Sequence, residues 1–482
     1  MDAVERLLRA RGVALVDGHE AADLVVVNTC TVTSIADRKS RQAVRRARRT
    51  NPDAEVFVTG CSVAIDPEAL AAADPSARFF DNESKARLRD ELASLLELGD
   101  GQPMPTLSGV ESAGGQDTHR AGGRTGDRTV DRAVGSSPSR SFDLEADEGS
   151  VEDAFGDRTD IDRTRAFVKI QDGCSFHCTY CIIPRARGPA RSIAAEAVLA
   201  EVRRATAAGH REVVLTGINA GTYDGGPAGE GAAAGLSLAG LVRRILAETE
   251  VERVRLSSIE PEHVTDELLD VWTGSGGRCL PHFHIPLQSG DDTILRRMGR
   301  RYDTAFYRDL AARVRRVIPR VAVHADVIAG FPGEDDAAWA RTVAFLRSLD
   351  LAGVHVFRYS ARPGTAAARM VGQVDGRTKR RRSAEALALA VEARARFAQL
   401  HLGRELTVLF EQPLPDGRWL GHAESHVLVA AAAPAPADGG SLANVIGLVR
   451  AESIDSTVPD RLVGSLLSVS RAQEPLAESA LK

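Results

Sequence analysis

Residues 172–181 read DGCSFHCTYC and place three cysteines in a Cys-x3-Cys-x2-Cys pattern. The pattern directly follows the apolar run AFVKIQ (166–171), which predicts a β-strand. On one tight loop, Cys174, Cys178 and Cys181 can bind three corners of an iron–sulfur cube, since thiolates are the usual ligands of such clusters. The fourth iron would stay open, so we predict a reactive cluster at the end of a strand.

A zinc loop is the alternative for clustered cysteines. Structural zinc takes four closed ligands, usually with a second cysteine pair, and no such pair follows Cys181. His177 is awkwardly placed between the cysteines to serve as the fourth ligand. The sequence therefore favours the iron–sulfur interpretation.

Around this loop the sequence alternates strand and helix patterns from residue 164 to about residue 400. Helical patterns of crossover length occur between the strand candidates, for example at 237–248 and 339–349. This order predicts a parallel α/β barrel, or part of one, with catalytic groups at the carboxyl ends of its strands. The six strand candidates are residues 166–171, 212–217, 253–258, 282–287, 321–330 and 353–359.

Residues 1–99 predict a small, doubly wound parallel sheet covered by helices. Two Val-rich runs, LVVVNT (24–29) and EVFVTG (55–60), are each followed by a cysteine, Cys30 and Cys61. Since neighbouring strand ends converge at one edge of such a sheet, the two thiolates can meet there. The alternative is a pair of buried apolar thiols, which is also our interpretation of the isolated Cys279.

Three further segments complete the expected organisation. Residues 100–163 are rich in Gly, Ser, Asp, Arg and Thr and predict a disordered insertion or linker. A long amphipathic helix over 379–403 ends the barrel region. Short strands with Gly, Pro and Asp turns in 401–470 predict a small all-β barrel of the size used to bind RNA, followed by a tail at 471–482.

Composition restricts the class of protein. The chain has 482 residues, 43% of them hydrophobic, with no apolar run of membrane-spanning length and a charged N-terminus, so we expect a cytoplasmic protein of several domains. Six cysteines are too few for a disulfide framework. Basic runs are solvated faces by default, but beside a small β-barrel they support contact with an RNA backbone. They comprise Arg45, Arg46, Arg48 and Arg49; Arg296, Arg297, Arg300 and Arg301; and Lys379 to Arg382.

Taken together, the motifs resemble the methylthiotransferase family of radical S-adenosylmethionine enzymes, over nearly the whole chain apart from 100–163. That resemblance implies a methylthiotransferase N-terminal domain, a radical core barrel and a C-terminal TRAM β-barrel, in the order found here. The motifs are VVVNTCTVT…ADRKSRQ…VTGC (25–61), FVKIQDGCSFHCTYCIIPRARGPARS (167–192), VVLTGINAGTY (213–223), RLSSIEP (255–261), HFHIPLQSGDDTILRRMGRRY (282–302), DVIAGFPGE (326–334) and YSARPGT (359–365).

The resemblance implies a reaction. It is closest to the bacterial branch that methylthiolates C2 of N6-threonylcarbamoyladenosine beside the tRNA anticodon. The 4Fe–4S cluster on the three-cysteine loop would reduce S-adenosylmethionine to methionine and a 5′-deoxyadenosyl radical, which abstracts hydrogen from C2 of the adenine. The implied partners are the tRNA anticodon stem-loop, a reducing electron donor and a sulfur donor. A ribosomal-protein methylthiotransferase and a non-catalytic iron–sulfur RNA-binding protein are the alternatives.

A second, auxiliary 4Fe–4S cluster is implied in the N-terminal domain, where it would deliver sulfur as a methylthio unit. Its ligands in this sequence would be Cys30 and Cys61. The family supplies a third cysteine from a GC-x-x-N stretch on a strand upstream of the helix at 5–12. This sequence begins at that helix, so we expect the domain to lack its first strand and the auxiliary site to be incomplete.

The resemblance also implies contacts to S-adenosylmethionine. Tyr180 stands where the family places an aromatic residue near the adenine of the cofactor. A strand-end carboxylate can instead cap a helix, and His284 is equally well explained as a core histidine. Besides Tyr180, the expected cofactor contacts are Gly217, Asn219, Ser258 and Glu260, and the residues expected to line the same pocket are His284, Gln288 and Ser289.

Overall fold

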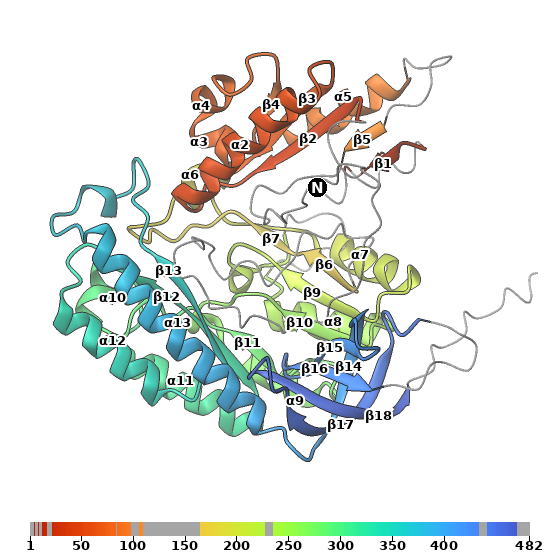
Figure 1. Ribbon diagram of the computed structural model, residues 1–482, viewed down its shortest axis with the longest axis vertical. Helices are drawn as coiled ribbons and strands as arrows, with labels where there is room; N and C mark the ends of the chain where they lie inside the picture. Colours follow the sequence, from red (N-terminus) through yellow and green to blue (C-terminus); the bar gives the residue numbers. More distant parts are fainter. Residues whose placement is uncertain are drawn as a thin grey trace, which may run out of the picture.

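A computed structural model describes residues 4, 8, 12–16, 22–82, 84–97, 106–108, 164–226, 235–432 and 441–469. Figure 1 shows three parts stacked along the long axis: the N-terminal sheet, a central αβ region, and a C-terminal β-barrel beside the lower end of the central strands. Within the described residues, no helix has the length and apolar character needed to cross a membrane.

The N-terminal domain is the expected parallel sheet. Strands β2 (Leu24–Thr29) and β3 (Glu55–Gly60) pair in register along their full length, with Thr29 opposite Gly60. The strand order is β1-β5-β2-β3-β4, with β1 at Ala14–Val16, β5 at Thr106–Ser108 and β4 at Arg78–Phe80. Helices α2 (Ser34–Thr50), α3 (Cys61–Ile65), α4 (Pro67–Ala71) and α5 (Lys85–Glu97) complete the domain.

Strand β5 corrects one expectation. It lies inside the 100–163 segment, which the sequence predicted to be disordered, and it pairs with both β1 and β2. The apolar centre of its three residues is too short a run to stand out in a stretch so rich in Gly and Ser. The remainder of that segment lies outside the described residues, as does the tail at 471–482.

The central region is an open barrel of six parallel strands. Sheets β6-β9-β10 and β11-β12-β13 meet through isolated parallel bridges from Val254 to Cys279 and from Ser258 to His284. All six predicted strands are present: β6 (Arg165–Lys169), β9 (Glu212–Thr216), β10 (Arg253–Leu256), β11 (His282–His284), β12 (Ala322–Ala329) and β13 (Gly353–Arg358). The loop after β6 carries a short β7–β8 pair, Gln171–Asp172 with Arg191–Ser192.

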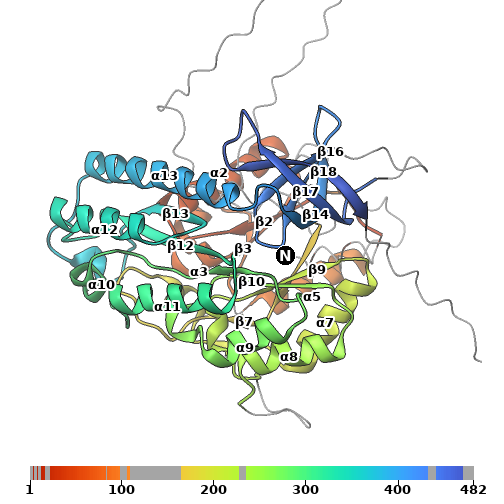
Figure 2. The same cartoon turned by 90° about the horizontal axis from the view of Figure 1, so that it is seen from below.

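Crossover helices cover the outside of the barrel, as Figure 2 shows from below. Their apolar faces and the outward faces of the strands form one continuous core, in which Cys279 is 4% exposed. Cys279 is thus a packed thiol, as the sequence predicted. The helices are α7 (Ala195–Ala207), α8 (Leu238–Glu248), α9 (Asp266–Gly274), α10 (Asp292–Met298), α11 (Thr304–Val317) and α12 (Asp336–Ser348), with the short α6 (Ile183–Arg187) after the cysteine loop.

Helix α13 (Gly376–Gln399) connects the open barrel to a closed five-stranded β-barrel. Asp375 caps its first turn by accepting a hydrogen bond from the Thr378 backbone. The closed barrel has the strand order β14-β15-β16-β18-β17, as predicted for an all-β module. Its strands are β14 (Glu405–Pro413), β15 (Trp419–Ala423), β16 (Leu428–Ala432), β17 (Ile446–Ile454) and β18 (Arg461–Val469).

Candidate functional site

The three-cysteine loop is fixed at both of its ends. The Cys174 backbone donates a hydrogen bond to the Gly188 carbonyl over 3.1 Å, and the Thr179 backbone donates one to the Met298 carbonyl over 2.9 Å. Gly173 has a φ of +69°, and a Cβ there would lie 2.0 Å from the Pro189 carbonyl oxygen. Glycine is therefore required for the turn that places the first cysteine.

The thiols of this loop suit an iron–sulfur cube better than a single ion. In the described part of the chain, one group of three His, Cys, Asp or Glu side chains has all its possible ligand atoms within 4.8 Å of one another. This group is His284, Asp326 and His355, and not the three cysteines. One tetrahedral zinc ion would need thiols closer than this, because Zn–S bonds are about 2.3 Å long. His177 is exposed. Three thiols on one loop, with no nitrogen ligand among them, fit a 4Fe–4S cluster.

Burial of these thiols also favours a positively charged partner. Desolvation raises the pKa of Cys178, and it raises the pKa of Cys181 to about 12. The neighbouring cysteines add to both shifts, because three thiolates on one loop repel one another. Ligation to iron removes this penalty, since the cations stabilise the thiolates that bind them.

Arg300 joins the cysteine loop to two residues expected at the cofactor. Its guanidinium donates to Cys178 Sγ over 3.3 Å and to the Tyr180 hydroxyl over 3.4 Å, and it forms an ion pair with Glu260. The Arg300 side chain is 3% exposed. The sequence placed Arg300 in a basic run for phosphate contact, which is wrong for this residue.

Among the residues expected to contact S-adenosylmethionine, Asn219 is distinguished by a side-chain amide that has no hydrogen-bond partner in the described protein. It is 3% exposed, and both side-chain amide atoms are buried without a hydrogen-bond partner. Its backbone N–H is held by Gln171 Oε1 at 2.9 Å. Gly217 lies against the same glutamine, where a Cβ would meet Gln171 atoms at 3.0 Å. Buried amides normally have partners, so these atoms point to a missing ligand.

Ser258 and His284 are already partnered in the structure. His284 Nδ1 lies 3.1 Å from Ser258 Oγ, and its Nε2 lies 2.6 Å from Asp326 Oδ1. Both residues face the interior of the barrel. Attraction to Asp326 raises the pKa of His284 although burial lowers it.

Gln288 and Ser289 are not among the residues that line the interior cavity that Ser258 and His284 line. Gln288 has a φ of +69°, and its backbone bonds to β12 through the Asp326 carbonyl at 2.7 Å. The turn sends Ser289 inward, where its hydroxyl lies 3.3 Å from that of Thr342 in α12. Both residues therefore fix the chain between β11 and α10.

Cys30 and Cys61 follow directly on the paired residues Thr29 and Gly60, so the two cysteines lie side by side at the edge of the sheet. Gly60 has a φ of +105°, and a Cβ would be 2.2 Å from the Thr29 carbonyl oxygen. The Ser62 hydroxyl donates to the Cys30 carbonyl over 2.8 Å. The register therefore places both cysteines directly after the carboxyl ends of neighbouring strands.

Residues of the central barrel complete the surroundings of Cys61. Arg187, six residues after the three-cysteine loop, donates to Cys61 Sγ over 3.2 Å and to Asp172 Oδ1 over 3.0 Å. Asn82 donates to Cys61 Sγ over 3.7 Å and to the Ala186 carbonyl over 2.8 Å. One guanidinium therefore joins Cys61 to Asp172, which lies two residues before Cys174.

A second contact between the domains lies beside Cys30. Arg362, from the YSARPGT loop, is 4% exposed, donates to Thr31 Oγ1 over 2.8 Å and pairs with Asp37. Asp37 also accepts from Ser62 Oγ at 3.2 Å. No motif in the sequence predicted Arg187 or Arg362 in these roles.

Beneath the cysteine loop, the interior of the open barrel contains a cavity of about 620 Å³. All six strands contribute to its wall, and the C-terminal barrel closes it from below. Its lining is unusually rich in imidazoles: His282, His284, His324, His355, His422 and His426. We call this space the lumen cavity.

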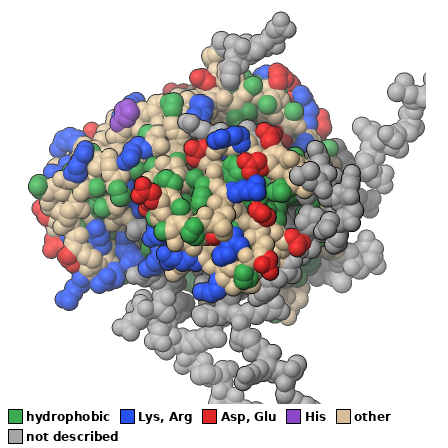
Figure 3. Space-filling view, turned by 90° about the horizontal axis from the view of Figure 1, so that it is seen from above, with side chains coloured by type: hydrophobic (Ala, Val, Ile, Leu, Met, Phe, Trp, Pro, Cys, Tyr) green, Lys and Arg blue, Asp and Glu red, His purple; other side chains and the backbone are tan. Residues whose placement is uncertain are grey.

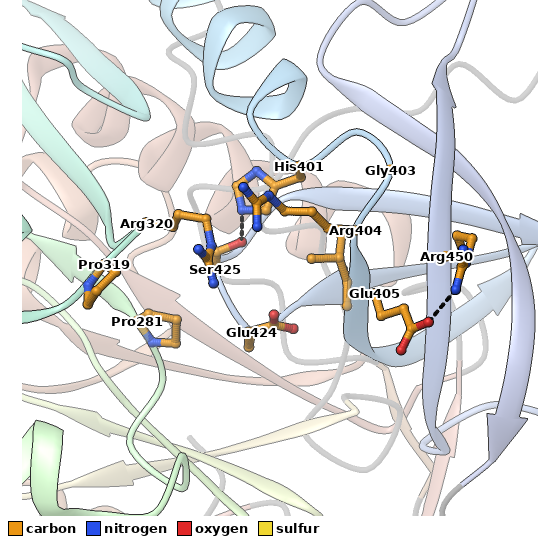
Figure 4. A pocket seen from close by; sticks show the side chains of 11 residues that line it. Pro281, Pro319, Arg320, His401, Gly403, Arg404, Glu405, Glu424, Ser425 and Arg450 are labelled. Atoms are coloured by element: carbon orange, nitrogen blue, oxygen red, sulfur yellow. Dashed lines mark hydrogen bonds and ion pairs between the residues drawn. The ribbon is translucent and has the colours of Figure 1, made fainter.

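A smaller cavity of about 410 Å³ lies where the two barrels meet, and Figure 4 shows its side chains. His401 bonds to Ser425 over 3.0 Å, and Arg450 pairs with Glu405 over 2.5 Å. Carboxylates lie among its arginines, so its charge is mixed.

The basic runs divide between solvent and the interior. Arg45, Arg46 and Arg49 are exposed on α2, whereas Arg48 pairs with Asp74 and Arg382 is buried against Glu334. Figure 3 shows Lys and Arg side chains spread over the face that carries the N-terminal domain, with acidic side chains among them. Only part of each run is therefore available to a polyanion. Trp419 packs against the core of the C-terminal barrel.

Comparison with known proteins is consistent with this site. Residues 168–346 match the model of the Radical SAM superfamily, and residues 1–80 match that of the uncharacterized protein family UPF0004.

Two curated relatives align over most of both chains. The threonylcarbamoyladenosine tRNA methylthiotransferase MtaB of Bacillus subtilis is 33% identical over 89% of this chain and 86% of its own. The tRNA-2-methylthio-N(6)-dimethylallyladenosine synthase of Maricaulis maris is 30% identical over 98% and 95%. Among solved structures, the radical S-adenosylmethionine methyltransferase TsrM of Kitasatospora setae has a TM-score of 0.47 at 17% identity, covering 76% of this chain and 68% of its own.

Proposed function

Because the chain belongs to the radical S-adenosylmethionine methylthiotransferase family, we propose that it adds a methylthio group to C2 of N6-threonylcarbamoyladenosine next to the anticodon of tRNA. The observation that carries the proposal is the three-cysteine loop at the mouth of an open parallel barrel. A cluster held there leaves one iron facing the barrel interior, where strand-end side chains gather. The B. subtilis relative is named for this modified adenosine.

The residues around the loop then have distinct tasks. Cys174, Cys178 and Cys181 would bind the 4Fe–4S cluster, which supplies the electron that splits S-adenosylmethionine when both are bound. Asn219 offers its unpartnered amide to the polar end of that cofactor. Tyr180 is held in orientation by Arg300, and Glu260 neutralises the same guanidinium.

The N-terminal edge would supply two ligands, Cys30 and Cys61, to the auxiliary cluster. Cys30 and Cys61 follow paired residues of neighbouring strands, and Arg187 donates a hydrogen bond to the Cys61 sulfur. We place the methylthio donor at this edge, with a sulfur donor and an electron donor as further partners. Exposed arginines on α2 would contact the RNA backbone, and a tRNA substrate places the protein in the cytoplasm.

Anaerobic reconstitution tests this function. With dithionite, S-adenosylmethionine and an anticodon stem-loop RNA carrying N6-threonylcarbamoyladenosine, we expect 5′-deoxyadenosine and a 2-methylthio product by mass spectrometry. Cys178→Ala should abolish both, whereas Cys279→Ala, a cysteine packed in the core, should abolish neither. A wild-type preparation that modifies a ribosomal protein and leaves the RNA unchanged would contradict the proposal in favour of the rival substrate.

A further inference from the structure

We propose that the lumen cavity binds the carboxylate of the substituent on N6 of the target adenosine, with Arg255 as the anion-binding residue. This proposal rests on the proposed function and adds to it a residue that selects the substrate. It concerns a space that neither cysteine site occupies. The cavity volume of about 620 Å³ lies within the range of sites for small organic groups.

Arg255 has donors that nothing in the described protein accepts. Its side chain is 3% exposed and lines the lumen cavity. Its Nε donates to Glu212 Oε1 over 2.8 Å, but Nη1 and Nη2 are buried without a partner. Unsatisfied charged donors are costly in a folded interior, so a ligand with acceptor oxygens is expected against them. The planar fork of a guanidinium matches a carboxylate.

The imidazoles around Arg255 point to the same kind of ligand. Nδ1 of His282, of His324 and of His426 is buried without a hydrogen-bond partner, and all three rings line the cavity. An apolar substituent in this space would leave every one of these nitrogen atoms unsatisfied. A substituent with hydroxyl and carbonyl groups can bond to them.

The cavity-lining arginines Arg165 and Arg255 and the charged residues that pair with them or share their partners carry one positive charge in excess. Each carboxylate there is already engaged: Glu212 with Arg253 and Arg255, and Glu411 with Arg165. Higher in the cavity His284 pairs with Asp326, and at its side Arg394 pairs with Asp460. This set contains three positive and two negative side chains: Arg165, Arg253 and Arg255, and Glu212 and Glu411.

The cavity also reaches towards the chemistry. Ser258 lines its upper end, and two residues along the chain Glu260 pairs with Arg300 at the cysteine loop. An adenine held near that loop can therefore direct its N6 substituent down the lumen. The threonylcarbamoyl group carries one carboxylate and one hydroxyl, whereas a dimethylallyl group carries no polar atom.

A divalent metal ion is the competing occupant. His284, Asp326 and His355 place their ligand atoms within 4.8 Å of one another. However, His284 and Asp326 are joined directly by the 2.6 Å hydrogen bond, so this group is satisfied without an ion. The unpartnered donors lie elsewhere in the cavity, on Arg255 and its neighbours, which is why we favour an anion.

A chemical change in the ligand tests the proposal without altering the protein. We would measure binding of three anticodon stem-loop RNAs to the reconstituted holoenzyme with S-adenosylmethionine: one with N6-threonylcarbamoyladenosine, one with its methyl ester, and one with N6-dimethylallyladenosine. Loss of a hydrogen-bonded charge pair predicts that the acid binds about 10-fold to 100-fold more tightly than the ester. Equal binding of acid and ester would overturn the proposal.

Variants assign the effect to Arg255. Because Arg255→Gln removes one of the two arginines that pair with the buried Glu212 and leaves it with Arg253, it is paired with the double variant Glu212→Gln/Arg255→Gln, which removes both charges. The double variant should bind acid and ester equally, while the surface control Arg244→Gln should keep the wild-type ratio. Full acid preference in a folded double variant would overturn the role of Arg255.

Two further outcomes are separable. A wild-type enzyme that produces 5′-deoxyadenosine but never methylthiolates the threonylcarbamoyl RNA refutes the proposed function and this inference with it. Normal methylthiolation with no distinction between acid and ester refutes the inference alone. If the wild type binds one equivalent of divalent metal, and His355→Phe loses both the metal and the preference for the acid, the cavity would be assigned to a metal instead.

Discussion

Replacing Arg362 by methionine should separate radical formation from methylthio transfer. Arg362 reaches from the central barrel into the N-terminal domain, where it bonds Thr31 and pairs with Asp37. Methionine keeps much of the side-chain volume but leaves Asp37 without its counter-ion. The N-terminal domain, which carries Cys30 and Cys61, would then lose one of the contacts that fix its position relative to the three-cysteine loop.

The expected magnitude follows from burial. Removing one partner of a buried ion pair costs about 3–5 kcal/mol. Asp37 is 16% exposed and keeps some access to water, which favours the lower value of about 3 kcal/mol. At about 1.4 kcal/mol per factor of ten, the contact between the domains should open more than 100 times as often.

Hydrogen–deuterium exchange of the peptide spanning Thr31–Asp37 measures that opening in the reconstituted holoenzyme. Exchange should rise about 100-fold in Arg362→Met, while 5′-deoxyadenosine continues to form and the yield of methylthio product per 5′-deoxyadenosine falls. The double variant Asp37→Asn/Arg362→Met removes both charges and should lose much less protection than the sum of the single variants. Strict additivity, or unchanged exchange in Arg362→Met, would refute this account of the contact.

Three further predictions follow from the sites. Cys178→Ala should lose about one cluster's worth of iron by ferrozine assay, whereas Cys279→Ala should keep its iron; equal losses would refute the assignment. Gly60→Ala places a Cβ against the Thr29 carbonyl at a φ of +105° and should remove the iron of the N-terminal site while 5′-deoxyadenosine still forms; full iron content would refute the strain. Burial lowers the pKa of His355 to about 4, so below pH 6.5 the unfolded apo-protein binds more protons at this residue than the folded protein does. This difference should lower the free energy of unfolding by about 1–2 kcal/mol between pH 7 and pH 5. Denaturant melts of His355→Phe should therefore depend less on pH than those of the wild type, and an identical dependence would contradict this.

The parts of the fold that were predictable depend on local patterns. The six barrel strands are short Val-rich or Ile-rich runs bounded by turn residues, so each is visible without knowledge of its partners. The position of Cys30 and Cys61 after neighbouring strand ends was also predictable, because parallel strands end at a shared edge. The strand at Thr106–Ser108 was missed, since a three-residue run has no periodicity.

The parts that were missed depend on contacts between distant segments. Arg300 lies in a run of arginines, and nothing local separates it from its solvated neighbours; only the position of α10 beside the cysteine loop does. The turn at Gln288 was not predicted, because its left-handed backbone conformation is set by pairing with β12 rather than by a local glycine. The imidazoles of the lumen cavity come from both barrels, so no sequence window contains them.

The C-terminal barrel has a consequence for how this enzyme can change its RNA partner. His422 and His426 come from that barrel, yet they line the lumen cavity together with residues of the six strands. An RNA-binding module is usually exchangeable because it is tethered to an enzyme and shares no wall with it. Here a transplanted module would leave the lumen cavity without its lower wall, so the C-terminal barrel and the barrel interior are constrained to evolve together.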